Sequence, residues 1–110
     1  MNTPPKVIAE IGCNHRGEIE TAIELIEVAA VFAKVDAVKF QKRTNRELLS
    51  PAEFDAPHPN PSNSYGDTYG AHREALEFDL EVHRELKSIA EARGVVYSCS
   101  VWDPTSAREI

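Results

Sequence analysis

The chain has 110 residues, of which 42% are hydrophobic and 27% charged, and its formal net charge is −6. This length suits one domain, and this composition is typical of a globular protein in water. The negative charge argues against a general nucleic-acid-binding protein, and no apolar run approaches the roughly 20 residues needed to cross a bilayer. We therefore expect neither a nucleic-acid partner nor a membrane partner.

Two cysteines, Cys13 and Cys99, form neither a CxxC pair nor a disulfide framework. The N-terminal residues lack the basic start, apolar stretch and cleavage site of a secretory signal. We interpret the cysteines as reduced thiols and expect a cytoplasmic protein.

The first part of the chain predicts a strand, a helix and a second strand. Residues 6–12 form a short apolar run that ends in a glycine, and residues 36–41 form another. Residues 18–34 predict an amphipathic helix, because their apolar side chains recur at spacings of three and four. The predicted inner face of this helix contains Ile19, Ala22, Ile23, Ile26, Ala29, Ala30 and Ala33.

The second part begins with a long connection. Residues 42–78 are predicted to be irregular because four prolines interrupt them, and a connection of this length is usually a lid, a binding loop or disordered. Residues 79–93 predict a helix that Asp79 caps and Gly94 ends. Residues 95–100 predict a third strand, and a further helix begins after it, at Asp103-Pro104.

Alternating strands and helices predict an α/β fold with a parallel sheet. Three parallel strands leave two long edges exposed, and the sequence stops one turn into a helix. We therefore expect residues 1–110 to form the first three βα units of a TIM (β/α)8 barrel, an incomplete N-terminal portion. An open doubly wound sheet is the alternative, but no GxGxxG follows the first strand.

Each predicted strand has one face that becomes polar toward its C-terminal end, because side chains alternate along a strand. These faces contain Ile8, Glu10 and Gly12; Ala37, Lys39 and Gln41; and Val96, Ser98 and Ser100. In a barrel they point inward near the C-terminal mouth, where functional sites lie. Lys39 is then a site lysine that faces Glu10 and a ligand. The alternatives are a structural Lys39–Glu10 ion pair, or a lysine that reaches out from an edge strand.

Other polar residues allow two interpretations. Asn14 and His15 line the mouth of the site, or they form a local turn. His72 and Arg73 contact an anion, or they simply begin the second helix. The histidines show no ligand spacing, so no metal site is predicted from these residues.

Two stretches of the sequence carry a resemblance to a known family. IAEIGCNHRGEIETAIELIEVAA followed by DAVKFQKR resembles the N-terminal segment of the sialic acid synthase (N-acetylneuraminate synthase) family. The stretch GVVYSCSVWDPTSA resembles the region of that family's third strand. The resemblance covers nearly the whole chain apart from most of the proline-rich connection.

The resemblance implies a transferase of carbohydrate biosynthesis with a (β/α)8 barrel. Such enzymes join phosphoenolpyruvate to an N-acetylated sugar aldehyde, such as N-acetylmannosamine or its 6-phosphate, and release phosphate. By position, Lys39 is implied to hold the phosphoenolpyruvate anion and Ser100 to hydrogen-bond it. Glu10 is implied to orient the sugar or to move a proton near the reacting carbon. Gln41 is a further substrate-binding candidate.

The resemblance also implies a divalent metal, Mn²⁺ or Mg²⁺, whose ligands we expect outside this chain, and a homodimer. We expect the C-terminal antifreeze-like domain of the family to be absent from these 110 residues, and we expect them to be inactive on their own. The third strand ends in CSVW where many relatives have an STPF-like run, so Trp102 leaves the exact substrate open. The alternatives are a legionaminic acid, pseudaminic acid or surface-polysaccharide synthase, and a truncated, non-catalytic protein that binds an anion or a partner.

Overall fold

The structure is a computed structural model that describes residues 3–110. Its strands are β1 (Ile8–Gly12), β2 (Ala37–Lys42) and β3 (Val96–Val101). Its helical segments are α1 (Ile19–Glu27), η1 (Val28–Phe32), α2 (Asn45–Leu48), α3 (Pro51–Asp55), η2 (Pro61–Asn63), α4 (Tyr69–Ala75), α5 (Leu80–Ala92) and α6 (Pro104–Glu109).

The three strands form one parallel sheet in the order β1-β2-β3. In the register, Glu10 lies beside Lys39, and Gln41 lies beside Ser100. Strands and helices alternate along the chain as in the first units of a (β/α) barrel, so the predicted fold class is confirmed.

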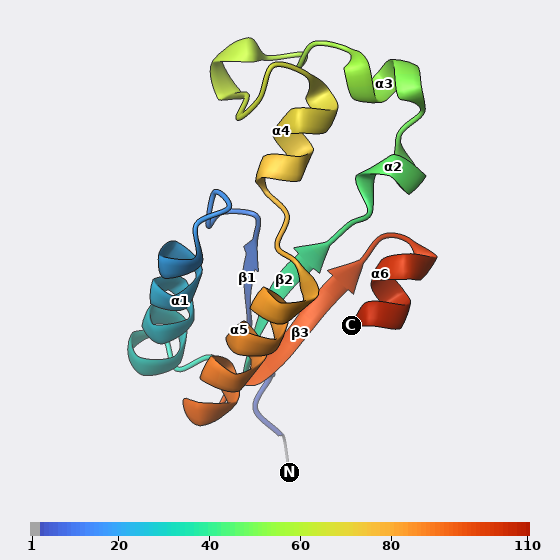
Figure 1. Cartoon of the computed structure of the whole chain (residues 1–110). Helices are drawn as coiled ribbons and strands as arrows, with labels where there is room; N and C mark the ends of the chain where they lie inside the picture. The colour runs from blue at the N-terminus through green and yellow to red at the C-terminus, as the bar shows by residue number, and fades with distance from the viewer. Residues whose placement is uncertain (1–2) are drawn as a thin grey trace.

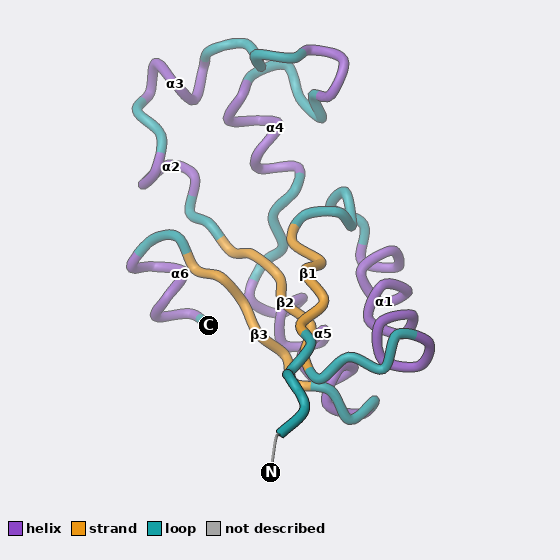
Figure 2. Tube along the Cα trace, turned by 180° about the vertical axis from the view of Figure 1, so that it is seen from behind, coloured by secondary structure: helices purple, strands orange, loops and turns teal. Residues whose placement is uncertain are grey.

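Helices cover one face of the sheet. In Figure 1 helix α5 lies in front of the strands and α1 lies beside β1, whereas the opposite view in Figure 2 shows the strands uncovered. On the covered face Val38 and Phe40 are fully buried, and they pack with Ile26 of α1 and Leu86 of α5. The apolar side chains of β2 therefore face the helices.

Helix α5 follows its prediction closely. The Asp79 side chain accepts a hydrogen bond from the Val82 backbone N–H, and Gly94 has a φ of +76° just beyond the helix. The first helix differs at its end, because its last turn is the π-helical η1, where the Ala33 N–H donates to the Val28 carbonyl five residues earlier. This wider turn leaves Ala33 exposed rather than on the inner face, and Val35 is buried instead.

The prediction of an irregular segment over residues 42–78 was wrong. The segment contains α2, α3, η2 and α4, and α3 and α4 pack around the buried Phe54. Two prolines start helices instead of breaking them, because Pro51 and Pro61 occupy first-turn positions, where a missing N–H costs nothing. Ser50 and Glu53 add a reciprocal capping box at α3.

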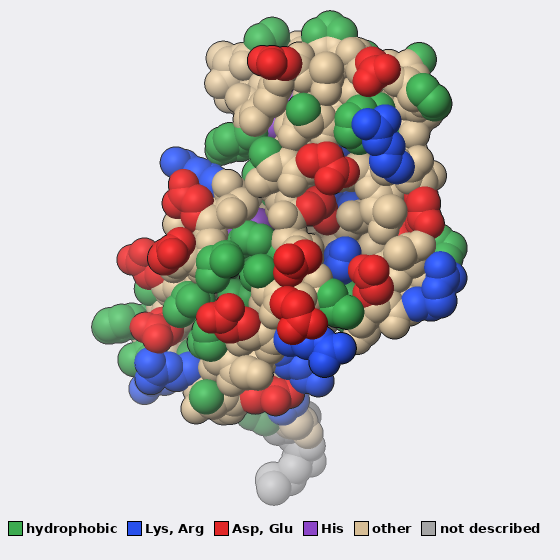
Figure 3. Space-filling model, viewed as in Figure 1, with side chains coloured by type: hydrophobic (Ala, Val, Ile, Leu, Met, Phe, Trp, Pro, Cys, Tyr) green, Lys and Arg blue, Asp and Glu red, His purple; other side chains and the backbone are tan. Residues whose placement is uncertain are grey.

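The α2–α4 segment lies over the C-terminal ends of the strands (Figure 1) and lengthens the molecule to 53 × 30 × 29 Å. Acidic and basic side chains intermingle over the described part of the helix-covered side (Figure 3), so no extended single-sign surface forms on that view. No helix within residues 3–110 has the length and apolar character needed to span a membrane.

Candidate functional site

Three of the predicted site residues meet on the uncovered face of the sheet. Lys39 Nζ lies 2.5 Å from Glu10 Oε2 and donates a hydrogen bond to Ser100 Oγ at 2.6 Å. The Lys39 and Glu10 side chains are 29% and 48% exposed, so the ammonium is held between fixed partners but is still open to a ligand. A half-exposed pair of this kind adds little to stability, which favours a binding role for the lysine.

A break in the β1 register places the Glu10 carboxylate. The pairing shifts between Glu10 and Gly12, and Gly12 has a φ of +56°, which favours glycine. A Cβ atom at Gly12 would lie 3.0 Å from Glu10 Oε1 and 3.5 Å from Gln41 Nε2. Glycine therefore leaves room for the glutamate and the glutamine at the point where β1 ends.

The polar face continues outward from Lys39 along β2. Gln41 Oε1 accepts a hydrogen bond from the Cys13 thiol at 3.6 Å, and Arg43 Nη2 donates to the same sulfur at 3.7 Å. Burial raises the pKa of the Cys13 thiol, although the neighbouring Arg43 cation opposes this rise. Cys13 is thus a neutral thiol that links Gln41 to Arg43, not an activated nucleophile.

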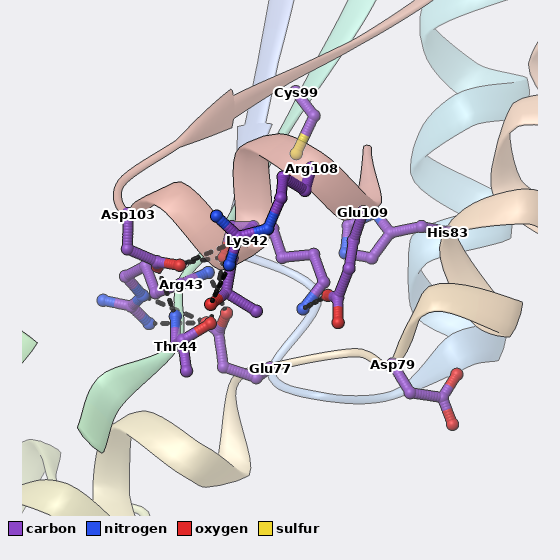
Figure 4. Close-up of polar contacts among 12 residues, drawn as sticks. Lys42, Arg43, Thr44, Glu77, Asp79, His83, Cys99, Asp103, Arg108 and Glu109 are labelled. Atoms are coloured by element: carbon purple, nitrogen blue, oxygen red, sulfur yellow. Dashed lines mark hydrogen bonds and ion pairs between the residues drawn. The ribbon is translucent and has the colours of Figure 1, made fainter. Parts of the chain in front are cut away.

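Arg43 is fixed by a single carboxylate. Glu77 Oε1 accepts from the Arg43 backbone N–H at 2.6 Å, and Glu77 Oε2 accepts from Arg43 Nε at 3.0 Å. Both side chains are only 10% exposed, and Figure 4 shows them at the end of β2. This ion pair, with the backbone hydrogen bond beside it, joins the second strand to the segment that leads into α5.

Asp103 fixes the start of α6 against the same strand end. Its carboxylate accepts hydrogen bonds from the Thr44 backbone N–H at 2.6 Å, the Ser106 backbone N–H at 2.7 Å and the Ser106 hydroxyl at 2.9 Å (Figure 4). Burial alone would raise the pKa of Asp103, but the hydrogen bonds from Ser106 and Thr44 hold it far below its usual range. Asp103 therefore positions the strand ends as a permanent anion.

Two predicted site residues lie apart from Lys39. Asn14 is exposed, and its Nδ2 donates to the Ile11 carbonyl at 2.9 Å. The His15 ring is buried and stacks on Phe78 at 4.2 Å, and its Nδ1 accepts from the Gly17 backbone N–H at 2.9 Å. Burial lowers the pKa of His15, against the effect of a hydrogen bond to the Gly12 backbone. The structure places Asn14 in a local turn and His15 in the core, and the substrate-binding roles of both residues stay predictions.

The second buried histidine also lies on the helix-covered side. His83 Nδ1 is 2.6 Å from the Tyr97 hydroxyl, and His83 Nε2 has no hydrogen-bond partner among residues 3–110. Burial lowers the pKa of His83 to about 4 and raises that of Cys99 to about 11. These groups are neutral at physiological pH and belong to the core.

The described residues do not fit the divalent metal that the resemblance implies. Within residues 3–110 no group of three His, Cys, Asp or Glu side chains is placed to hold a metal ion. The Glu10 carboxylate is already engaged with Lys39. The expected location of the metal ligands in other segments therefore stays a prediction.

Comparison with known proteins identifies the family. The sequence model of the NeuB family matches residues 25–110. The chain belongs to the NeuB family. It is 35% identical over 100 residues to the N-acetylneuraminate-9-phosphate synthases of Mus musculus and Homo sapiens, covering 91% of this chain and 27% of each relative. It is also 31% identical over 97 residues to the N,N'-diacetyllegionaminic acid synthase of Campylobacter jejuni, covering 88% of this chain and 29% of that relative.

A solved structure has a similar fold. The N-acetylneuraminic acid synthetase of Leptospira borgpetersenii superposes with a TM-score of 0.73 at 24% identity, over 97% of this chain and 32% of that one. At this identity the likeness shows the fold. The chain spans about a quarter of the length of the curated NeuB relatives that it matches.

Three residues of the polar face around β2 were not predicted as site residues from the sequence: Cys13, Arg43 and Glu77. Arg43 carried a usable signal, because it has the same parity along the chain as Lys39 and Gln41. Glu77 carried none, because only the folded path of the α2–α4 segment brings it back to β2.

Proposed function

We propose that this chain forms the N-terminal part of a (β/α)8-barrel synthase that condenses phosphoenolpyruvate with an acetamido sugar. The observation that carries the proposal is the Lys39 ammonium, held by Glu10 and Ser100 on the open face of the sheet. Membership in the NeuB family and the names of the relatives support this reaction type.

Each of the three residues has a part in the proposed reaction. Lys39 binds the phosphoenolpyruvate anion, whose charge offsets the cost of holding an ammonium away from bulk water. Ser100 accepts from Lys39 and directs its own hydroxyl proton toward the same ligand. Carbon 3 of phosphoenolpyruvate forms a bond to the aldehyde carbon as the carbon 2–carbon 3 double bond opens, and the aldehyde oxygen takes up the proton that the water added at carbon 2 releases, a transfer that Glu10 is placed to assist. Water then adds at carbon 2, and phosphate leaves with cleavage of its C–O bond.

The rest of the enzyme is part of the same proposal. We assign residues 1–110 to the first three units of the barrel, since the curated relatives are almost four times as long as the matched segment. The metal ligands, the antifreeze-like domain and the homodimer contacts then belong to other segments. The free thiols of Cys13 and Cys99 suit a cytoplasmic enzyme.

A second acceptor is supported by the comparisons. The N,N'-diacetyllegionaminic acid synthases of Campylobacter jejuni and Legionella pneumophila are each 31% identical to this chain. In this alternative the phosphoenolpyruvate chemistry is unchanged, and the acceptor is a diacetamido sugar.

A hybrid enzyme tests the proposal. The matching 100 residues of the Mus musculus synthase are replaced by this chain, and phosphate release from phosphoenolpyruvate is measured with N-acetylmannosamine, with its 6-phosphate and with a diacetamido sugar. We expect turnover by the hybrid, none by the 110 residues alone, and a loss of at least about a hundredfold on Lys39→Ala. Removing a charge-assisted contact to the reacting anion costs about 3 kcal/mol or more.

The matched control in the hybrid is Lys87→Ala, which removes a lysine from the exposed side of α5. Circular dichroism first verifies that each hybrid folds. A folded hybrid whose turnover survives Lys39→Ala would contradict the assigned role. A folded hybrid that binds phosphoenolpyruvate without turnover would favour the non-catalytic anion-binding alternative.

A further inference from the structure

The side-chain amide of Gln41 has one end occupied and one end free. Gln41 Oε1 accepts a hydrogen bond from the Cys13 thiol at 3.6 Å, whereas no group within residues 3–110 accepts a hydrogen bond from Gln41 Nε2. The side chain is partly exposed, and Gln41 lies beside Ser100 in the sheet, on the same face as Lys39. Two N–H donors of this amide therefore remain available on the open face.

The Cys13 thiol determines which end of the amide is free. Burial raises the pKa of Cys13, so the sulfur keeps its proton at neutral pH and needs an acceptor for it. Arg43 Nη2 already donates to the same sulfur at 3.7 Å. A rotated Gln41 amide would place a second N–H donor on this weak acceptor and would leave the S–H proton unpaired. The hydrogen-bond pattern therefore favours Oε1 toward Cys13 and Nε2 away from it.

The arginine on the other side of the thiol is itself fixed. Glu77 Oε2 accepts from Arg43 Nε at 3.0 Å, and both side chains are only 10% exposed. Figure 4 shows this pair at the end of β2. Arg43 cannot rotate away from Cys13 without breaking a charge-assisted contact, so the thiol has a fixed donor on one side and the Gln41 oxygen on the other.

The free end of the amide lies next to Gly12 and close to the other site residues. A Cβ atom at Gly12 would lie 3.5 Å from Gln41 Nε2 and 3.0 Å from Glu10 Oε1. On the same face, Ser100 Oγ accepts from Lys39 Nζ at 2.6 Å, which leaves the serine hydroxyl proton free to donate. The free donors of this face therefore match a ligand that is rich in acceptor oxygens.

We propose that Cys13 is a positioning residue that orients the Gln41 amide, so that Nε2 donates to an acceptor oxygen of the bound ligand. The inference rests on the proposed function, in which Lys39 holds phosphoenolpyruvate on the same face. The acceptor is a carboxylate or phosphate oxygen of phosphoenolpyruvate, or a hydroxyl or amide oxygen of the sugar, because all of these offer a lone pair to an N–H donor. Cys13 acts on the ligand only through Gln41.

The orientation of the amide can be tested without any ligand. Gln41 is the only glutamine of the sequence, so isotopically labelled glutamine gives a single pair of side-chain amide signals by NMR. We expect these signals to differ from those of free glutamine in the wild type and to move toward them in Cys13→Ala. Cys13→Ser should retain most of the difference, because a hydroxyl donates to the same oxygen.

The matched control is Cys99→Ala, which removes the other thiol, on the helix-covered side, and should leave the Gln41 signals unchanged. Urea unfolding verifies that each variant is folded. Unchanged Gln41 signals in folded Cys13→Ala would overturn the inference, whatever the chain binds.

Calorimetric titrations with phosphoenolpyruvate and with N-acetylmannosamine then identify the ligand that Gln41 contacts. Gln41→Met should weaken binding of that ligand about fivefold, the effect of losing one hydrogen bond between neutral groups, and Cys13→Ala about threefold. In the Gln41→Met background, Cys13→Ala should have no further effect, because no amide remains to be oriented. A loss confined to phosphoenolpyruvate assigns the acceptor oxygen to that ligand, and a loss confined to N-acetylmannosamine assigns it to the sugar.

Two further results would contradict the positioning role. Equal weakening by Cys13→Ala in the wild type and in Gln41→Met would show that Cys13 acts independently of the amide. Wild-type affinity of Gln41→Met for both ligands would show that Nε2 contacts neither of them. A wild type without affinity for phosphoenolpyruvate would instead count against the proposed function, and the NMR comparison would still test the orientation of the amide.

Discussion

The six residues of β2 alternate between two faces of the sheet, one of which is buried and the other partly exposed. Val38 and Phe40 are fully buried beneath α1 and α5, and they form the centre of a close-packed core. Lys39 and Gln41, which point the other way, remain partly exposed; Lys39 forms an ion pair with Glu10, and Gln41 accepts a hydrogen bond from the Cys13 thiol. One face stabilises the fold, and the other keeps polar groups ready for a ligand.

This difference predicts whether a substitution changes stability or binding. On the covered face, apolar burial contributes about 25 cal/mol for each Å² removed from water, so truncations there reduce stability. On the open face, the half-exposed ion pair of Lys39 contributes little to stability, so truncations there change binding. Substitutions on both faces can test this division, beginning with the one that should reduce stability most.

Phe40→Ala should have the largest effect on folding. The ring is fully buried and lies 5.9 Å from the Tyr97 ring, so its removal leaves a cavity that the rigid sheet cannot close. We expect a loss of about 3–5 kcal/mol in the free energy of unfolding, measured by urea denaturation. Val96→Ala on the exposed edge is the control and should change it by less than about 0.5 kcal/mol. Similar losses for both variants would contradict the division between the faces.

Acidification should weaken the covered face through His83. The pKa of His83 is lowered to about 4 in the fold, chiefly by burial, against 6.5 for the free side chain. The unfolded chain therefore binds more protons between these values, so stability is full above pH 6.5 and falls as the pH drops toward 4. The loss attributable to His83 is of order 2–3 kcal/mol.

Urea midpoints at several pH values measure this slope. His15 has its pKa lowered in the same direction, so His83→Gln should make the slope shallower without removing it. An unchanged slope in His83→Gln would show that the His83 ring is not kept neutral by the fold.

Asp103→Ala should have an intermediate effect, because it removes the cap of α6 and the acceptor for the Thr44 backbone N–H together. We expect a loss of about 1–2 kcal/mol by chemical denaturation at neutral pH. Asp103→Asn is the matched variant, since an amide oxygen still caps the helix, and it should recover part of the loss. Equal losses would mean that the charge, and not the cap, carries the contribution.

Gly12→Ala should have a smaller effect on stability and should also change binding on the open face. Alanine at a φ of +56° costs about 1 kcal/mol, and its Cβ would crowd Glu10 Oε1 at 3.0 Å. The affinity for phosphoenolpyruvate should therefore fall severalfold by calorimetry. Gly94→Ala is the control, since it has a φ of +76° but no atom within 4 Å of its added Cβ, and it should leave affinity unchanged.

The sequence predicted what depends on local periodicity. Strand parity placed Glu10, Lys39 and Ser100 on one face of the sheet, and spacings of three and four placed Ile26 on the inner face of the first helix. Sequence patterns did not predict the contacts between segments that are distant in the chain. The stacking of His15 on Phe78 depends on the folded path of residues 42–78, and no local pattern indicates it. The prolines there were misinterpreted because a proline suits the first turn of a helix as well as a loop.

A calorimetric titration of the chain with phosphoenolpyruvate, in the wild type, Lys39→Ala and Lys87→Ala, decides most directly whether Lys39 is a binding residue. We expect Lys39→Ala to weaken binding at least about tenfold and to change the free energy of unfolding by less than about 1 kcal/mol, while Lys87→Ala changes neither. Unchanged affinity in Lys39→Ala, together with a loss of several kcal/mol in stability, would show that the Lys39–Glu10 pair is structural and would contradict a binding role for the open face.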